Sequence, residues 1–323
     1  MRESGQVKTR LANCRISYPS GLLSPLPHMS SHIRISPFSP LKMEELLKTG
    51  TEKNSSVLTP RFWLDNGREI TFASSGRQAL KMALNRIGLQ RDESVLIITT
   101  TGGPYISSCV TTAINEICRW TRDPEVGTKA VLLIHEFGFP CELPRFLSGL
   151  NLPVIEDCAY GIGSRIAGAA IGSIGDYAIY SLPKYYPVPF GGMLISKKEA
   201  ANICEKPLPD DDKDFLTDML MRSSGSQEEW NKIRRSNWEF FERQLRDHSV
   251  HPYFNLEDGV VPGTFIARAP FAVSGAQIKK NCVDAGIEAT EYYGNDGFYF
   301  PIHQFLTDYE RTYILLHFLM ENV

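Results

Sequence analysis

Residues 153–196 read PVIEDCAYGIGSRIAGAAIGSIGDYAIYSLPKYYPVPFGGMLIS, a stretch that contains three apolar runs of strand length. Two further runs precede it, SVLIITTT at 94–101 and KAVLLIHEFG at 129–138. These runs are nearly continuous in apolar residues, which is typical of strands buried on both faces of a parallel sheet. The intervening stretches at 107–120 and 143–150 have the spacing of helices. The pattern predicts an α/β domain with a mainly parallel central sheet flanked by helices.

The stretch ITFASSGRQALKMALNRIGL at 70–89 joins a short apolar run, a turn of small residues and apolar residues at helical spacing. It predicts a strand, a tight turn and a helix that ends at Gly88. At such a turn the amide groups of Gly76 and Arg77, the Ser75 hydroxyl and the helix dipole can form an anion site. A glycine at a helix start is often only part of a turn, so both interpretations stay open.

The composition is that of an ordinary globular protein, with 323 residues of which 42% are hydrophobic and 22% charged. Lys+Arg 34 and Asp+Glu 37 give 34 − 37 = −3, so no basic excess indicates a nucleic-acid partner. The seven cysteines include no C-x-x-C pair, and we interpret them as reduced thiols of a cytoplasmic protein. No apolar run reaches the roughly 18 residues of a membrane span, and no apolar segment of an export signal follows the start MRESGQVKTR.

We expect three parts in the chain. Residues 1–35 begin with a Ser- and Pro-rich stretch without a period, and we expect an extended N-terminal arm there. A large α/β domain is expected at 36–225. A polar stretch at 199–227 precedes the helical pattern EEWNKIRRSNWEFFERQLRD, and strands and helices mix in the remainder. We therefore expect a smaller α+β C-terminal domain at 226–323.

Two charged residues follow predicted buried strands. Asp157 ends the run PVIED, at the carboxyl end of a parallel strand, where open α/β folds bind ligands. Lys184 follows the run DYAIYSLP and is surrounded by apolar and aromatic residues, a setting that lowers the pKa of a lysine by desolvation. Each has a plainer interpretation, Asp157 as the cap of the next turn and Lys184 as a solvated surface charge.

Taken in order, these phrases resemble the DegT/DnrJ/EryC1/StrS sugar aminotransferase family, whose members have fold type I and use pyridoxal 5′-phosphate (PLP). The family pattern runs D-x-A-[QH]-A, G-x-x-x-G-x-x-G-D, a strand ending in Ser-Phe, a Lys, and a Gly-Gly pair. The corresponding residues here are Asp157-Cys158-Ala159-Tyr160, Gly168, Gly172, Gly175-Asp176, Ser181-Leu182, Lys184 and Gly191-Gly192. The interval from Lys184 to Gly192 is 192 − 184 = 8 residues, as in the family. The resemblance extends from Pro37 to the last predicted helix.

The resemblance implies a catalytic pair and a phosphate site. Lys184 is implied as the lysine that forms the Schiff base with PLP, and Asp157 as the partner of the protonated pyridine nitrogen, which makes the ring an electron sink. Ser181 and the turn Ser75-Gly76-Arg77 are implied as the residues that bind the phosphate.

The resemblance also implies two aromatic contacts with the cofactor. Tyr160 stands at the Gln/His position of the family and is expected near the 3-oxygen of the ring. Ser107 stands where the family stacks an aromatic residue on PLP, and Tyr105 is expected to replace it. The Asn-x-Arg-Met phrase of the family does not follow the glycine pair, and the chain is shorter than a typical member.

The function implied is a PLP-dependent aminotransferase that transfers an amino group from glutamate to a keto sugar. We expect the sugar to be nucleotide-linked, the pathway to make polysaccharide or amino sugars, and the enzyme to be a cytoplasmic homodimer without a membrane partner. Two alternatives remain. One is another PLP-dependent sugar reaction such as dehydration. Some dehydratases of this kind have His in place of the lysine, and the presence of Lys184 argues against that version. The other is a degenerate non-catalytic paralogue that acts as a binding or regulatory partner.

Other residues carry smaller hypotheses. His135 and Glu136 end a strand where they can face the substrate or bond to nearby backbone. His303 can reach the site or make a structural hydrogen bond, and Tyr185 and Tyr186 can line its mouth or a dimer interface. No His/Cys/Asp cluster has the spacing of metal ligands, and no G-x-S-x-G phrase occurs, so a metal site and an α/β-hydrolase are not predicted.

Overall fold

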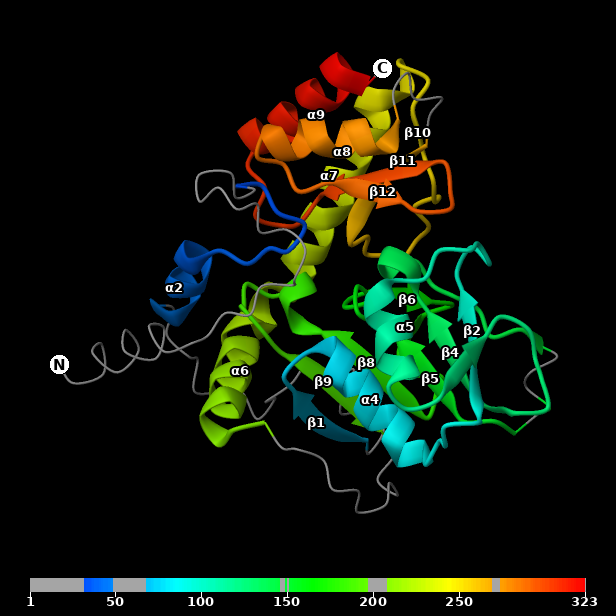
Figure 1. Ribbon diagram of the computed structural model, residues 1–323. Helices are drawn as coiled ribbons and strands as arrows, with labels where there is room; N and C mark the ends of the chain where they lie inside the picture. The colour runs from blue at the N-terminus through cyan, green and yellow to red at the C-terminus, as the bar shows by residue number, and fades with distance from the viewer. Residues whose placement is uncertain are drawn as a thin grey trace.

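The computed structural model describes residues 32–48, 68–145, 149, 151–196, 208–268 and 274–322. A seven-stranded sheet with helices forms the lower part of the molecule in Figure 1, and a four-stranded sheet with helices forms the upper part. The predicted α/β architecture is confirmed. None of the helices in the described ranges is long and apolar enough to cross a membrane.

The large sheet has the strand order β1-β9-β8-β5-β4-β2-β3. Its strands are β1 Glu69–Ala73, β2 Ser94–Thr99, β3 Arg119–Thr121, β4 Thr128–Ile134, β5 Val154–Asp157, β8 Tyr177–Ser181 and β9 Gly192–Ser196. The five strands from β3 to β8 are parallel, whereas β9 runs antiparallel to both of its neighbours. The carboxyl ends of the parallel strands therefore meet at one edge, as the sequence predicts.

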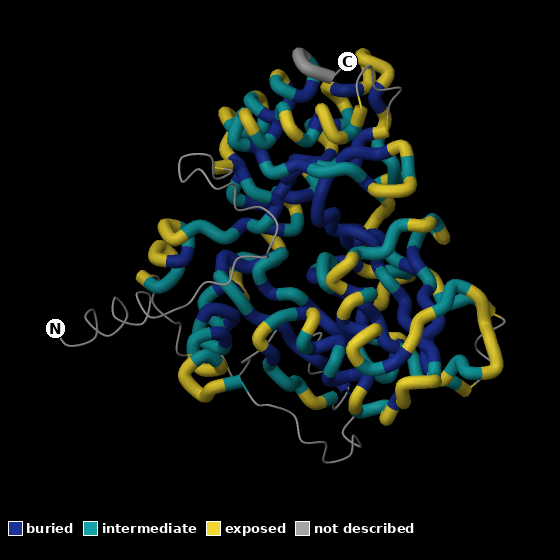
Figure 2. Tube along the Cα trace, in the orientation of Figure 1, coloured by how far each residue is buried: buried dark blue, intermediate teal, exposed yellow. Residues whose placement is uncertain are grey.

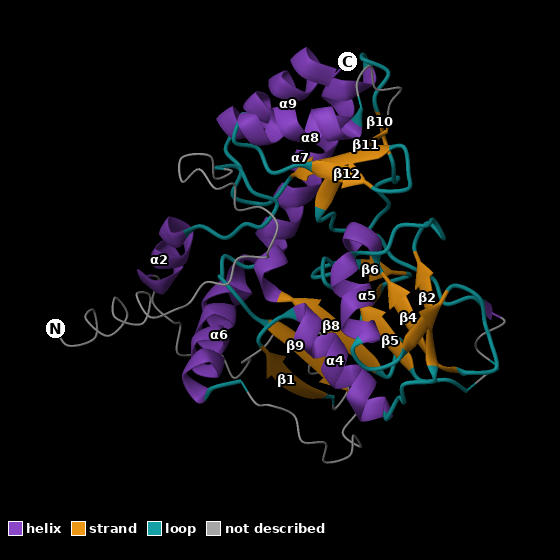
Figure 3. Ribbon diagram, in the orientation of Figure 1, coloured by secondary structure: helices purple, strands orange, loops and turns teal. Residues whose placement is uncertain are grey.

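Both faces of this sheet are covered, which explains the continuous apolar runs (Figures 2 and 3). Alternate strand residues such as Ile97 and Leu132 pack with helices α4 (Gly76–Ile87) and α5 (Ser108–Asn115). Their neighbours Leu96 and Val131 pack with Cys141 in another cluster. In β8, Tyr180 packs with Met43 of α2 (Pro40–Lys48) and Leu216 of α6 (Asp210–Ser223). A strand that is buried on both sides needs no polar positions.

Helix α4 begins and ends where the sequence predicts. Ser75 is its N-cap, in an extended conformation, and its side chain accepts a hydrogen bond from the Gln78 amide. Gly88 adopts the left-handed conformation with φ 82°, which favours glycine, and closes the helix through its own amide. The apolar face of the helix packs on the sheet and so holds the N-terminus of α4 at the carboxyl edge.

The predicted helix at 107–120 is too long. Helix α5 ends at Asn115, and Arg119–Thr121 forms the short edge strand β3, which pairs in parallel with β2. Arg119 and Trp120 are exposed, because an edge strand buries fewer side chains than a central one. The predicted helix at 143–150 lies partly outside the described residues.

The small sheet is antiparallel, in the order β10-β11-β13-β12. Its strands are β10 His251–Pro252, β11 Thr264–Arg268, β12 Thr290–Tyr292 and β13 Gly297–Pro301, and a separate hairpin joins β6 Arg165–Ile166 to β7 Ala169–Ala170. Helices α8 (Gly275–Asp284) and α9 (Asp308–Asn322) pack with this sheet. Ser274 is the N-cap of α8, and its side chain accepts from the Gln277 amide.

Helix α7 (Gln227–Arg246) connects the two parts. Trp230 near its start packs in the core under the large sheet, and Trp238 and Phe241 pack in the core of the small sheet. The predicted domain boundary at 225/226 stays a prediction. Of the predicted N-terminal arm, residues 1–31 lie outside the described ranges, and Ile33 is buried and forms a β-bridge with Ile287.

Candidate functional site

A carboxylate and an amine lie together at the carboxyl edge of the large sheet. Asp157 ends β5, and Lys184 ends the short 3-10 turn Leu182–Lys184 that follows the neighbouring strand β8. Burial raises the pKa of Asp157, and the Ala159 amide donates to its Oδ1 at 2.9 Å. Burial lowers the pKa of Lys184, while the charge of Asp157 opposes that shift. The Lys184 amine is thus easier to deprotonate than a solvated one, as a nucleophile requires.

Tyr160 supports the Lys184 amine from one side. The Nζ atom of Lys184 lies 3.8 Å from the centroid of the Tyr160 ring, a cation–π contact. Burial raises the pKa of the Tyr160 phenol, so it stays protonated at neutral pH. The structure therefore brings Tyr160 to Lys184. Its predicted contact with the 3-oxygen of a cofactor stays a prediction.

The predicted anion site lies at the start of α4. The ideal Cβ position of Gly76 is only 3.1 Å from the Cβ of Ser181, so the turn and the end of β8 are in close contact. Ser75 forms a β-bridge with Gly191, and a Cβ at Gly192 would lie 2.3 Å from the Ser75 carbonyl carbon. The two glycines of the pair permit this approach. Amide groups in the first turn of a helix lack intrahelical acceptors and attract anions.

Arg77 contacts a residue that the sequence analysis missed. It is exposed, and its Nη2 donates to Sγ of Cys109 at 3.2 Å, in the first turn of α5. Burial opposes ionisation of Cys109, but the hydrogen bond and charge of Arg77 and the charge of Lys184 lower its pKa overall. The sequence signal that could have placed Cys109 is Ser107, a helix-capping residue two positions earlier. The Ser107 side chain accepts from the Cys109 amide at 3.3 Å, so Cys109 lies in the first turn of the helix.

Tyr105 belongs to a group of aromatic residues beside Lys184. Its ring centroid lies 4.9 Å from that of Tyr292 and 6.0 Å from that of Phe137. Phe137 is buried and has a φ of 54°, in the left-handed region that a bulky residue rarely adopts. Burial, together with the charge of Tyr160, raises the pKa of Tyr105. Tyr105 is thus available beside Lys184, whereas Ser107 serves as the cap of α5.

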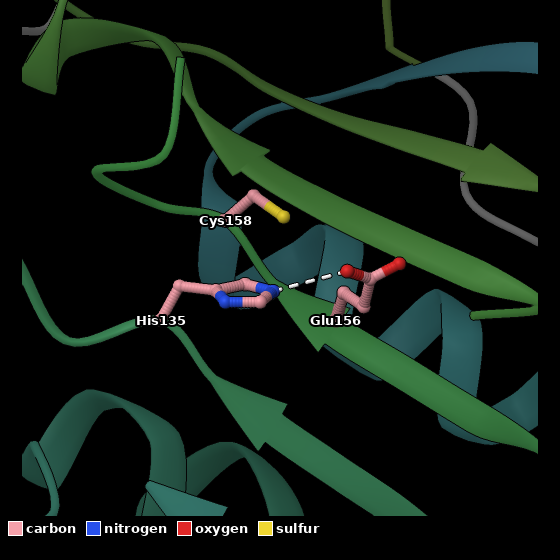
Figure 4. A group of neighbouring side chains, drawn as sticks. All are labelled: His135, Glu156 and Cys158. Atoms are coloured by element: carbon pink, nitrogen blue, oxygen red, sulfur yellow. Dashed lines mark hydrogen bonds and ion pairs between the residues drawn. The ribbon is translucent and has the colours of Figure 1, made fainter. Parts of the chain in front are cut away.

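The His135 side chain is buried and lies beside Glu156 and Cys158 (Figure 4). Its Nδ1 accepts from the Cys141 amide at 2.8 Å, so its Nε2 carries the proton toward Oε2 of Glu156 at 3.0 Å. The ligand atoms of His135, Glu156 and Cys158 lie within 4.8 Å of one another, as metal ligands do. However, both ring nitrogens are occupied, and burial raises the pKa of the Cys158 thiol well above its usual range.

Glu156 is the centre of this group. Its Oε2 also accepts from the Gly172 amide at 2.8 Å, and its Oε1 accepts from Ile174 at 2.8 Å and Gly175 at 2.6 Å. Despite its burial, these bonds and His135 lower the pKa of Glu156. The arrangement fixes the loop between β7 and β8 beneath Asp157, which is a structural function.

Glu136 and His303 make hydrogen bonds within the chain. Glu136 accepts from the Thr101 amide at 2.8 Å and from the Tyr292 hydroxyl at 2.6 Å. Burial lowers the pKa of His303 to about 3, and its Nδ1 accepts from the Phe305 amide at 3.2 Å. Neither reaches Lys184 through a hydrogen bond that the described residues show.

Tyr185 and Tyr186 are buried core residues. They are 1% and 0% exposed, and their rings pack with each other and with Trp230. The Tyr185 hydroxyl donates to Asn231 at 2.6 Å. Such side chains are part of the interior of one chain, so the alternatives of a site mouth or a subunit interface are wrong.

Comparison with known proteins agrees with the resemblance. Residues 125–205 match the DegT/DnrJ/EryC1/StrS aminotransferase family. A GDP-perosamine synthase from Escherichia coli O157:H7 is 29% identical over 144 residues, which cover 39% of this chain and 40% of the relative. This chain thus spans well under half the length of that relative. The resemblance to this family predicted from the sequence is confirmed.

The fold is shared with solved structures. The aminotransferase TlmJ from Streptoalloteichus hindustanus superposes with a TM-score of 0.65 at 16% identity, over 86% of this chain and 93% of that chain. The PLP form of Spr1654 from Streptococcus pneumoniae superposes with a TM-score of 0.59 at 15% identity, over 86% of this chain and 94% of that chain. The predicted fold class is confirmed.

Proposed function

We propose that this relative of the DegT/DnrJ/EryC1/StrS aminotransferase family is a PLP-dependent enzyme that transfers an amino group to a keto sugar. The observation that carries the proposal is the pairing of Lys184 with Asp157 at the sheet edge, next to the N-terminus of α4. The lysine, the carboxylate and the anion site come from three separate elements, and a scaffold without chemistry has no need to bring them together.

The residues present fit PLP. The phosphate would lie at the start of α4, against Ser75, Gly76 and Ser181, with Arg77 adding charge. Asp157 would accept from the ring nitrogen, and Tyr105 and Tyr160 offer aromatic and phenolic contacts nearby. Lys184 would hold the cofactor covalently. When bound, PLP supplies an electron sink that lets a substrate C–H or C–N bond be made and broken.

The chain's own residues then carry out three tasks. The Asp157 side chain, oriented by the Ala159 amide, would accept a hydrogen bond from a protonated ring nitrogen. Lys184 Nζ, with its lowered pKa, can accept a proton from a substrate carbon and return it to another position. The ring of Tyr160 keeps the amine on one side of the site while it is protonated.

The finer assignment of substrates is part of the proposal. The matched relative is named as a GDP-perosamine synthase, which supports a nucleotide-linked keto sugar as acceptor and amino-sugar or polysaccharide biosynthesis as the pathway. We propose glutamate as the amino donor and a homodimer as the active form. A cytoplasmic location is supported by five free cysteines among the described residues.

The test is borohydride trapping of the protein with PLP, followed by peptide mass mapping. We expect a pyridoxyl group on Lys184, its loss in Lys184→Ala, and no change in Lys81→Ala. Lys81 is a suitable control because it lies on α4 and pairs with Glu116. In a parallel assay, the untreated protein is tested for the conversion of glutamate to 2-oxoglutarate. If no lysine is labelled, the enzyme proposal is wrong.

A further inference from the structure

The backbone around Lys184 is held by side chains from distant parts of the chain. Ser36 Oγ donates to the Pro183 carbonyl at 2.6 Å, Arg234 Nη2 to the Lys184 carbonyl at 3.0 Å, and Gln304 Nε2 to the Tyr185 carbonyl at 2.8 Å. Three consecutive carbonyl groups are thus bonded to three separate segments. Ser36 comes from the N-terminal segment, Arg234 from α7, and Gln304 from the loop before α9.

Two of these side chains form one buried unit. Arg234 is 1% exposed, and its Nε donates to Gln304 Oε1 at 2.7 Å. Its guanidinium lies 4.7 Å from the centroid of the Tyr185 ring. Burying an arginine costs free energy, and the Arg234 donors are bonded to the Gln304 side chain and the Lys184 carbonyl.

The turn that carries Lys184 has little support of its own. It is a single 3-10 turn, in which the Tyr185 and Tyr186 amides both bond to the Leu182 carbonyl. Pro183 has no amide hydrogen to donate. The last carbonyl groups of a turn have no partner within it. Without external donors, a rotation of the Lys184 peptide would move Nζ away from Asp157.

We propose that Ser36, Arg234 and Gln304 form a carbonyl clamp that positions Lys184 for its reaction with the cofactor. The reaction of Lys184 with the cofactor rests on the proposed function, whereas the three hydrogen bonds to the backbone are present without a cofactor. Arg234 and Gln304 are positioning residues, because they bond to the backbone of Lys184 and Tyr185 and act through Lys184. The clamp also links the placement of the amine to the small domain, which contributes Gln304.

The first experiment measures amide hydrogen exchange without PLP. We expect Arg234→Gln and Gln304→Leu to speed the exchange of peptides that contain Tyr185 and Tyr186 by about tenfold or more. The matched control is Arg235→Gln. Arg235 is the next residue of α7 and also bonds to two carbonyl groups, those of Glu257 and Val260. It should leave exchange around Lys184 unchanged.

The second experiment measures the rate at which PLP becomes attached to Lys184, followed by borohydride trapping at successive times. We expect at least about a tenfold loss in Arg234→Gln, partial rescue in Arg234→Lys, and no loss in Arg235→Gln, because small misplacements of a reacting group cost large factors in rate. If Arg234→Gln does not fold, Gln304→Leu and Ser36→Ala provide the same test.

The outcomes separate the two proposals. Faster exchange around Tyr185 in Arg234→Gln and in Gln304→Leu but not in Arg235→Gln, with slower trapping, supports the clamp. Equal exchange and trapping in Arg234→Gln, Gln304→Leu and wild type overturn it, as does an equal effect of Arg235→Gln. If wild type itself traps no PLP, the proposed function fails, and the exchange measurement alone decides whether the clamp exists.

Discussion

Glu156→Gln is expected to destabilise the protein strongly although it changes a single atom type. The Glu156 carboxylate accepts four hydrogen bonds, three from the backbone amides of the 172–175 loop and one from His135. A glutamine has one acceptor oxygen. If that oxygen takes the position of Oε1, the Ile174 and Gly175 bonds remain, and the new NH₂ group faces the donors of Gly172 and His135.

The expected loss follows from those contacts. A hydrogen bond to a charged group contributes about 1.5–3 kcal/mol, so two lost bonds cost about 3–6 kcal/mol. Because a domain is stable by only about 5–15 kcal/mol, the change removes a large part of the free energy of unfolding.

The assay is urea unfolding at neutral pH. We expect a lower midpoint for Glu156→Gln with an unchanged slope. The control is Glu116→Gln, which removes the exposed partner of Lys81 and should cost less than about 1 kcal/mol. A loss below about 1 kcal/mol for Glu156→Gln would refute the assignment of the four bonds.

The pH dependence provides a second check. The folded pKa of Glu156 is lowered, because the bonds from His135 and the loop outweigh burial. Its contribution to stability is therefore fully present above the unfolded pKa of about 4.3, and it is lost as the pH falls through the lower folded value. Wild type should lose stability in this acid range more steeply than Glu156→Gln. Identical acid profiles would contradict the reasoning.

Two further predictions concern the carboxyl edge of the large sheet. Asp157→Asn removes the charge that raises the pKa of Lys184, so the midpoint of the pH profile for PLP trapping should move to lower pH; a midpoint that stays or rises would argue against the pairing. Gly192→Ala places a Cβ 2.3 Å from the Ser75 carbonyl carbon, so it should cost about 1–3 kcal/mol in urea unfolding and weaken PLP binding measured by absorbance. Gly225→Ala, with nothing within 4 Å of its Cβ, is the matched control and should change neither.

The sequence by itself determined the sheet and the turn and helix end of α4. These features follow from local rules. Continuous apolar runs require a sheet covered on both faces, and Ser75 and Gly88 bound a helix through their own backbone conformations. The pairing of Asp157 with Lys184 was implied by the family resemblance, and the structure brings the two residues together because β5 and β8 are neighbours.

Only the tertiary structure decided which polar residues serve the site and which support it. Asp157 is in register with Ile134, the last residue of β4, and His135 comes one residue later. The His135 ring is bonded to the Cys141 amide and to Glu156. The bond from Arg234 to the Lys184 carbonyl spans 50 positions in the chain, and that from Gln304 to Tyr185 spans 119. Such bonds depend on how α7 and the small sheet pack against the large one. No spacing along the chain encodes that packing, because it depends on the side chains of all the elements in contact.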